Sequence, residues 1–340
     1  MNPPRKSRAK QIDSSWIVSG IPSILLHMKE SLLPFLCCPD CRKDLHLKGG
    51  DKRSGDVVSG MLICTGCQHA YQIEHGVPCL LKERPESITQ KGFSEQWQLR
   101  QDGAFEKDSL FGFQIQEYVN HVKFAFGVDD LSKWKVDAFL DAGCGSGEMT
   151  RALAQAMPHA QVIGFDLSDS VFASASRGAG LHNCHFIQGD ILKHPFKPRS
   201  IDAVFSSGVL HHLPDPKGGC RSLWNACKGS FYFWVYPSYQ FCAYDWIRNK
   251  IRIGHKLTPQ NRRRVAWGLM PFLWCFFVLT KKYSYKTSLE SPSTIAFRLF
   301  DNLSPEFQFR FSKEDVKLWC AEVGGRSHQV LNDLGVRLVA

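Results

Sequence analysis

A glycine-rich turn preceded by a carboxylate carries the clearest chemical signal of the sequence. The turn ends the apolar segment that begins at Phe139, and its glycines are Gly143, Gly145 and Gly147. Side chains at these positions would keep a nucleotide-like ligand away from the backbone, whereas glycine lets the ligand approach. Asp141 precedes the turn and would repel a diphosphate, so the turn disfavours a dinucleotide and favours a ligand with cationic groups.

Two further acids follow the next two predicted strands. Asp166 comes 25 positions after Asp141, at the end of residues 161–165, where it is placed to accept hydrogen bonds from both hydroxyls of a ribose. Asp190 follows residues 185–187 and is placed to accept from the exocyclic amine of an adenine. S-Adenosylmethionine joins an adenosine to a sulfonium and an amino group and carries no phosphate. The three acids therefore predict this cofactor.

Two pairs of cysteines have the spacing of a zinc site. Cys38 and Cys41 form one C-x2-C pair, Cys64 and Cys67 form the second, and 22 residues separate the pairs. Two such pairs supply four thiolates, which complete a tetrahedron around one Zn²⁺. A segment of about 45 residues buries too little apolar surface to fold alone, so we expect the ion to stabilise it. Cys37 adjoins the first pair and is an alternative to Cys38.

The elements that must position these residues follow from the apolar pattern. Short apolar runs alternate with segments long enough to form helices, which predicts a parallel α/β sheet. The predicted strands cover residues 138–140, 161–165, 185–187, 203–205 and 231–235. Ser312 and Asp315 predict a capping box at the start of a helix that Gly324 ends. Residues 327–331 and 336–339 predict a final pair of strands.

From about Asp137 to the C-terminus, these motifs resemble the class I S-adenosylmethionine-dependent methyltransferases, in particular the methyltransferase type 11-like proteins. The resemblance implies a Rossmann-like, seven-stranded sheet whose last strand is antiparallel. It also implies which residues line the cofactor site. They are Asp141, Gly143, Gly145, Asp166, Leu167, Asp190, Ile191, Ser206 and Ser207, and the turn adds Gly147.

Residues 36–81 resemble the small zinc-ribbon domain that serves as the activator subunit of tRNA and protein methyltransferases. In bacteria, similar domains are also fused ahead of class I methyltransferase domains. The resemblance implies a structural zinc, because protein thiols fill all four positions around the ion. Residues 93–97 also resemble a segment of such fused proteins, and we expect this segment to fold over the cofactor without a chemical role.

His211 and His212 are the candidate catalytic residues. They lie in the loop after the fourth predicted strand, and an imidazole with its usual pKa of about 6.5 is able to take the proton of a hydroxyl acceptor. The alternative is that they only hydrogen-bond the loop, since a His-His pair here is common in the family without being catalytic. The loop 206–209 also lacks the Asn-Pro-Pro-Tyr motif that family members acting on the amino groups of bases often carry.

A basic and aromatic insertion covers about residues 237–311. Between Tyr236 and Ser291 there are ten lysines and arginines against two acids. Within it, Val265–Thr280 is uncharged and strongly apolar, and as a helix it would reach about 24 Å, short of the hydrocarbon core of about 30 Å. Three interpretations stay open: a buried lid helix, a lid that also dips into a membrane surface to collect an apolar acceptor, and a platform for RNA.

The whole chain has 340 residues and a formal net charge of +10. Neither an apolar run of 18 residues nor a signal peptide is apparent, so we expect a cytoplasmic protein that is peripheral at the membrane if it contacts one. The expected organisation is a basic tail and short helix (1–35), the zinc ribbon (36–81), a linker with a helical lead-in (82–135) and the methyltransferase domain (136–340).

These features predict a zinc-containing methyltransferase that acts at an oxygen of a small, apolar or lipid-linked acceptor. Its expected partners are that acceptor and an anionic membrane surface. One alternative is an rRNA or tRNA methyltransferase whose ribbon binds RNA. Another is an adaptor that keeps the fold and only binds partners.

Overall fold

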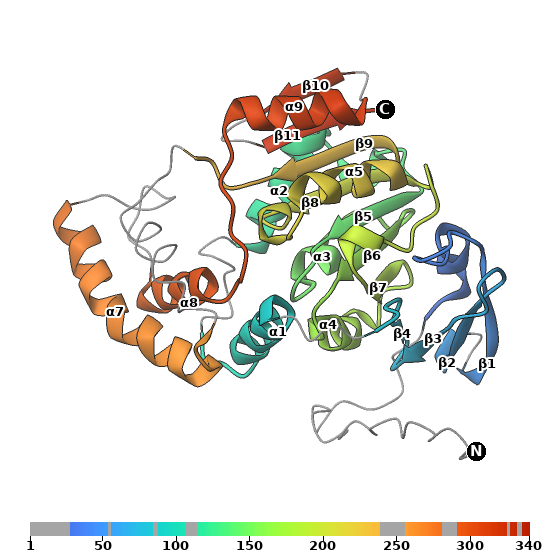
Figure 1. Ribbon diagram of the computed structural model, residues 1–340, viewed down its shortest axis with the longest axis horizontal. Coiled ribbons are helices and arrows are strands. Elements are labelled where there is room, and N and C mark those ends of the chain that lie inside the picture. Colours follow the sequence, from blue (N-terminus) through green and yellow to red (C-terminus); the bar gives the residue numbers. More distant parts are fainter. Residues whose placement is uncertain are drawn as a thin grey trace, which may run out of the picture.

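The computed structural model of the protein describes residues 28–53, 56–83, 88–105, 114–238, 256–280, 291–324, 327–331 and 335–340. Most of the expected basic tail lies outside these residues. Figure 1 shows two sheets side by side, a small N-terminal one and a larger one, with a group of helices at the opposite end of the molecule.

The small sheet is antiparallel and forms the ribbon. Its strands pair in the order β1-β2-β3-β4, preceded by the 3-10 helix η2. These elements are η2 (Glu30–Phe35), β1 (Leu45–Arg53), β2 (Asp56–Cys64), β3 (Ala70–Glu74) and β4 (Val77–Pro78). Alternate side chains of β3 are buried, including Tyr71 and Ile73, as expected for strands that present one face to a core.

The larger sheet has the strand order β10-β11-β9-β8-β5-β6-β7. Strands β5 to β9 run parallel, and β11 is antiparallel to both β9 and β10. Their bounds are β5 (Ala138–Ala142), β6 (Gln161–Asp166), β7 (Cys184–Gln188), β8 (Ile201–Ser207), β9 (Cys227–Trp234), β10 (Ser327–Val330) and β11 (Gly335–Val339). The predicted α/β fold is confirmed, and each predicted strand is present.

Helices cover both faces of this sheet, because successive side chains of a strand point to opposite faces. In β5, Phe139 faces a core with α2 and α3, whereas Leu140 faces a core with α5 and α9. The helices are α2 (Ile115–Phe126), α3 (Glu148–Ala156), α4 (Ser170–Gly178), α5 (Pro216–Ala226) and α9 (Lys313–Val323). The predicted capping box of α9 is present, and Gly324 ends the helix with φ 74°.

A second group of helices packs together beyond the edge of the sheet: α1 (Ile88–Gln101), α7 (Pro259–Thr280) and α8 (Pro292–Leu303). Phe105, Ala266 and Phe300 are buried in the core of this group. Helix α1 begins inside the stretch that the sequence suggested as a linker. Among the described helices, none combines the length and the apolar character needed to cross a membrane.

The ribbon and the larger sheet share one hydrophobic core. Leu36 of the ribbon bridges Phe196, which follows β7, and the backbone N–H of Leu80 donates to the carbonyl of Gln188 at 2.8 Å. The Arg42 guanidinium donates to the carbonyls of His194 and Phe196. The ribbon therefore stabilises the sheet edge that carries β7, next to the predicted adenosine site.

We expect Arg42→Met to lower the free energy of unfolding by about 1–2 kcal/mol, because it leaves two carbonyls without their donor. Urea denaturation of the full chain measures this change. Lys43→Met, on the same turn, is the matched control and should have little effect. Equal stability of the two variants would contradict the proposed role of Arg42.

Candidate active site and metal centre

Asp141 is a buried carboxylate at the end of β5. Thr150 of α3 donates to its Oδ2 at 2.6 Å, and no ion pair to a lysine or arginine is present among the described residues. Burial raises the pKa of Asp141 to about 7, the negative charge of Asp166 adds to the rise, and the Thr150 hydrogen bond opposes it. A bound cation would supply the compensating charge that the described residues do not provide.

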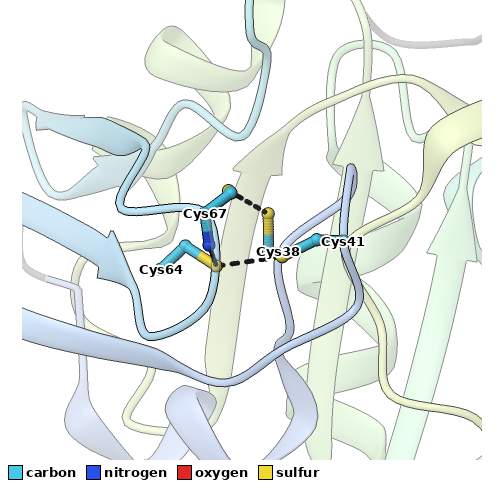
Figure 2. Close-up of side chains that lie close together, drawn as sticks. All are labelled: Cys38, Cys41, Cys64 and Cys67. Carbon is cyan, nitrogen blue, oxygen red and sulfur yellow. Dashed lines mark hydrogen bonds between the residues drawn. The ribbon is translucent and has the colours of Figure 1, made fainter.

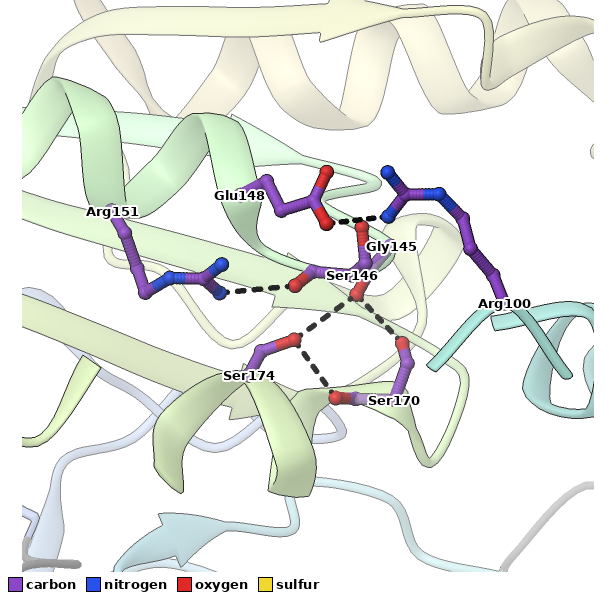
Figure 3. Close-up of polar contacts among 7 residues, drawn as sticks. All are labelled: Arg100, Gly145, Ser146, Glu148, Arg151, Ser170 and Ser174. Atoms are coloured by element: carbon purple, nitrogen blue, oxygen red, sulfur yellow. Dashed lines mark hydrogen bonds and ion pairs between the residues drawn. The ribbon is translucent and has the colours of Figure 1, made fainter. Parts of the chain in front are cut away.

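The glycine turn is held from several sides. Gly143, Gly145 and Gly147 have φ of 85°, 52° and 66°, a region that favours glycine. Figure 3 shows Ser170 and Ser174 of α4 donating to the carbonyl of Gly145, at 2.7 and 3.4 Å. The turn is therefore fixed in shape before any ligand binds.

Side chains of the protein lie against two of these glycines. A Cβ at Gly143 would come 2.2 Å from Val209, and a Cβ at Gly145 would come 2.6 Å from the Trp97 indole. Both glycines are thus required by packing within the chain, in addition to any role in admitting a ligand. The glycine spacing in the sequence indicated only the second reason.

Asp166 joins the turn to β6. Its Oδ2 accepts the backbone N–H of Gly145 at 2.8 Å, and its Oδ1 accepts the N–H and the hydroxyl of Ser168 at 2.8 and 2.7 Å. A carboxylate offers about four acceptor positions, and donors from Gly145 and Ser168 occupy three of them. Asp166 is therefore able to bind one ribose hydroxyl directly, and the second hydroxyl must share or displace Ser168.

The remaining predicted cofactor residues lie along the same edge of the sheet, where the parallel strands end. Asp190 accepts the N–H of Leu192 at 2.9 Å as the N-cap of the 3-10 helix η4 (Ile191–Lys193). Ser206 donates to the carbonyl of Ala142 at 3.0 Å, Ser207 ends β8, and Ile191 is buried. The carbonyl of Leu167 accepts from Gln90 and Gln188, each at 3.3 Å. Their contact with a cofactor stays a prediction.

Helix α1 supplies residues that the sequence analysis did not assign. Arg100 forms an ion pair with Glu148 at the start of α3 (Figure 3), and Ser94 accepts the N–H of Asp169 at 3.1 Å. Trp97 lies against Gly145. The segment 93–97 was the only signal of this arrangement, since α1 lacks a strong apolar stripe. Helix α1 lies across the glycine turn.

His211 and His212 belong to the 3-10 helix η5 (Leu210–His212) that follows β8. The His211 ring stacks on Tyr236, with ring centres 3.8 Å apart, and neither ring nitrogen has a hydrogen-bond partner among the described residues. Burial holds the pKa of His211 well below its usual value, and the charges of His212 and Arg310 lower it further. His212 differs, because its Nδ1 donates to the carbonyl of Phe307 at 3.0 Å.

The four predicted metal ligands come together in the ribbon (Figure 2). All four sulfur atoms lie within 4.8 Å of one another, with Cys38 and Cys67 separated by 3.7 Å and Cys41 and Cys64 by 3.2 Å. A ZnS4 tetrahedron with Zn–S bonds of about 2.3 Å needs S···S distances of about 3.8 Å. The thiols therefore fit one zinc ion.

The surroundings of the thiols support a closed, structural site. The Tyr71 hydroxyl lies 3.2 Å from the Cys38 sulfur and donates to Asp40 at 3.3 Å. A backbone hydrogen bond from Lys43 is the largest of the effects that lower the pKa of the Cys41 thiol to about 6. Cys37 is not part of the cluster, and its N–H donates to the carbonyl of Pro195. The structure thus favours Cys38 over Cys37.

We expect one zinc ion per chain, and removing it with a chelator should lower the melting temperature by about 10 °C or more, because the ribbon shares its core with the sheet. Metal analysis and calorimetry of the full chain measure both quantities. Cys64→Ser should lose the ion, whereas Cys37→Ser should keep it. An unchanged melting temperature after complete zinc removal would contradict a structural role.

We expect S-adenosylmethionine to bind about tenfold more tightly at pH 8 than at pH 6, because Asp141 ionises with a pKa of about 7 and only its charged form attracts a cation. Titration calorimetry measures the affinity at each pH. Asp141→Asn should weaken binding at pH 8 and remove this dependence, whereas Asp130→Ala, at an exposed cap, should retain it. The same pH dependence in Asp141→Asn would exclude Asp141 as its source.

Two family models match the chain. Residues 139–229 match the methyltransferase domain family, and residues 29–76 match the Trm112p-like protein family. The first range contains the glycine turn, the three acids and both histidines. The second contains all four thiols.

The relatives found by sequence include several methyltransferases, which share only part of the chain. Sterol 24-C-methyltransferase erg6 of Aspergillus fumigatus is 32% identical over 177 residues, which cover 49% of this chain and 45% of that protein. Trans-aconitate 2-methyltransferase of Deinococcus radiodurans is 40% identical over 85 residues, which cover 25% and 31%. The chain thus spans less than half the length of these relatives.

Solved structures with a similar backbone include magnesium protoporphyrin IX methyltransferase from Synechocystis with bound S-adenosylhomocysteine. It is 15% identical, with a TM-score of 0.43 over 75% of this chain and 98% of that chain. A complex that contains the Haloferax volcanii Trm112 methyltransferase activator gives 17% identity and a TM-score of 0.41, over 71% and 81%.

The family matches agree with the geometry at both sites. The three acids and the glycine turn lie in the matched methyltransferase segment, and the four clustered thiols lie in the matched ribbon segment. S-Adenosylmethionine is the cofactor of this methyltransferase family. The chain therefore contains a class I S-adenosylmethionine-dependent methyltransferase domain, matched over residues 139–229, and a Trm112-like zinc-ribbon domain, matched over residues 29–76.

Proposed function

We propose that the protein transfers a methyl group from S-adenosylmethionine to a hydroxyl oxygen of a small, apolar or lipid-linked acceptor. The observation that carries this proposal is His211, a buried imidazole at the carboxyl edge of the sheet without a hydrogen-bond partner among the described residues. Buried polar groups are nearly always hydrogen-bonded in folded proteins. An acceptor hydroxyl would supply the missing partner.

The position of His211 suits this role. The side chain of Val209, two residues earlier, lies against Gly143 of the turn. The backbone of η5 therefore connects the histidine directly to the predicted cofactor site. Phe93, Trp234 and Tyr236 surround the histidine pair with aromatic rings, which favours an apolar acceptor.

Bound S-adenosylmethionine would supply a methyl group on a cationic sulfur, which becomes neutral when the methyl group leaves. Asp141 and Asp166 would bind and orient the cofactor, as their charge and position at the turn suggest. His211 is neutral at physiological pH because burial lowers its pKa. A hydroxyl becomes strongly acidic as its oxygen gains the methyl group, so even a weak base at Nδ1 or Nε2 suffices to accept the proton.

The similarity to a sterol 24-C-methyltransferase supports an apolar acceptor, although that relative is named for transfer to carbon. Transfer to oxygen is favoured here by the His211 imidazole, which has no hydrogen-bond partner in the described ranges. The loop after β8 also lacks the motif associated with base amino groups. An RNA acceptor, suggested by the net charge of +10, is the competing outcome of the test.

The test is incubation of the full chain with methyl-labelled S-adenosylmethionine and a fractionated cell extract. We expect the label in the lipid or small-molecule fraction, released by conditions that cleave methyl ethers or esters. Label that enters only RNA, or that resists such cleavage because it is on carbon, would overturn the proposal. A chain without its four ribbon thiols is unsuitable as a blank, so heat-inactivated protein serves instead.

We expect His211→Ala to lower kcat about 100-fold or more, while the affinity for S-adenosylmethionine stays within about twofold. Turnover of the labelled acceptor and calorimetry measure these two quantities. His212→Ala is the control from the same helix. It should lower kcat less, because the Nδ1 of His212 already donates to the carbonyl of Phe307. Comparable kcat values for His211→Ala and wild type between pH 6.5 and 8.5 would exclude His211 as the base.

A further inference from the structure

Helix α7 presents an apolar stripe to the outside of the molecule. Its members repeat at helical spacing and are all exposed: Val265, Leu269, Phe272, Phe276 and Leu279. Steps of four and three residues place them on one face of the helix. Phe272 and Leu279 are 76% and 83% exposed, values that are unusual for large apolar side chains in a folded protein. The stripe extends over about 21 Å.

The opposite side of α7 is already used for packing. Ala266 is buried, and Trp267, Met270 and Leu273 pack against the core that α7 forms with α1 and α8. Figure 1 shows α7 at the outer edge of this helical group, away from both sheets. The helix is therefore anchored through one side and displays the stripe on the other.

The charges around the stripe are positive. Residues 265–280 contain no charged side chain, Arg263 and Arg264 are exposed at one end, and Lys281 and Lys282 follow in the sequence at the other. An apolar, aromatic surface between basic side chains is complementary to a bilayer with anionic headgroups. RNA binding would instead interleave single aromatic side chains with cations along a groove.

We infer that α7 seats the protein on an anionic membrane surface, with Phe272 and Leu279 inserted among the acyl chains and Arg263 and Arg264 at the headgroups. The helix lies in the interface, because the described helices include none suited to crossing a bilayer. Lipid binding through this face does not depend on methyl transfer.

The stripe is linked to the predicted active site. Arg262, buried at the start of α7, forms an ion pair with Glu95 of α1 at 3.5 Å, and Gln96 of α1 donates to Asp301 of α8 at 2.8 Å. Trp97, the next residue of α1, lies against Gly145 of the turn. If the proposed function holds, this arrangement places an apolar acceptor dissolved in the bilayer within one layer of helices from the cofactor.

The experiment measures binding of the full chain to neutral vesicles of phosphatidylcholine and to anionic vesicles of phosphatidylcholine with about 30 mol% phosphatidylglycerol. Sedimentation without S-adenosylmethionine or acceptor gives a partition coefficient that is independent of catalysis. We expect binding to the anionic vesicles, weakened by salt. No binding to either vesicle would overturn the inference.

Two variants address the stripe itself. Phe272→Ser/Leu279→Ser should lower the partition coefficient about tenfold or more, and Arg263→Glu/Arg264→Glu should lower it by a similar factor. The matched controls remove exposed apolar side chains or charges elsewhere: Phe124→Ser/Leu318→Ser and Lys313→Glu/Lys317→Glu. The controls should bind as the wild type does. Equal losses in control and stripe variants would overturn the inference.

The alternative partner of the stripe is a second copy of the chain, which would form a dimer through this face. Light scattering of the wild type and of Phe272→Ser/Leu279→Ser separates the two cases. If the wild type and the variant are both monomers, the result supports membrane binding. A wild-type dimer that the stripe variant converts to a monomer would overturn the inference in favour of self-association.

Discussion

The predicted active site depends on one electrostatic constraint, a carboxylate buried at the end of β5 with no lysine or arginine paired to it in the part of the chain that the structure describes. Asp141 is held by a single hydroxyl, and a second carboxylate, Asp166, lies close enough to raise its pKa. Two acids at one turn disfavour phosphate and favour a cationic ligand. The surrounding structure, from the left-handed glycines to the serines of α4, holds this turn in place.

The zinc ribbon contacts the sheet where β7 ends, at the carboxyl ends of the parallel strands. It extends the core through Leu36 and Phe196 and joins the end of β7 through main-chain hydrogen bonds. The strand that it supports leads directly to Asp190. A zinc ion held by the four thiols would stabilise the ribbon. The ribbon contacts the end of β7, and β7 leads to the predicted adenine contact.

The sequence was sufficient for the elements with strong local patterns. Apolar runs predicted β5 to β9, cysteine spacing predicted the thiol cluster, and Ser312 with Asp315 predicted the start of α9. The sequence was insufficient where tertiary contacts determine the position or orientation of a helix. Helix α1 has no marked apolar stripe, so its position over the turn was visible only through a resemblance. Residues 265–280 are apolar on all sides, so no periodicity distinguished the packed side of α7 from the exposed one.

The contact between Trp97 and Gly145 has a consequence for how the protein can change over evolutionary time. The two residues are 48 positions apart, yet any side chain at 145 would collide with the indole. A larger side chain at position 145 requires a smaller side chain at position 97 in the same protein. Helix α1 and the turn are thus expected to co-vary among homologues, and a chimera that takes the two segments from different parents should assemble poorly.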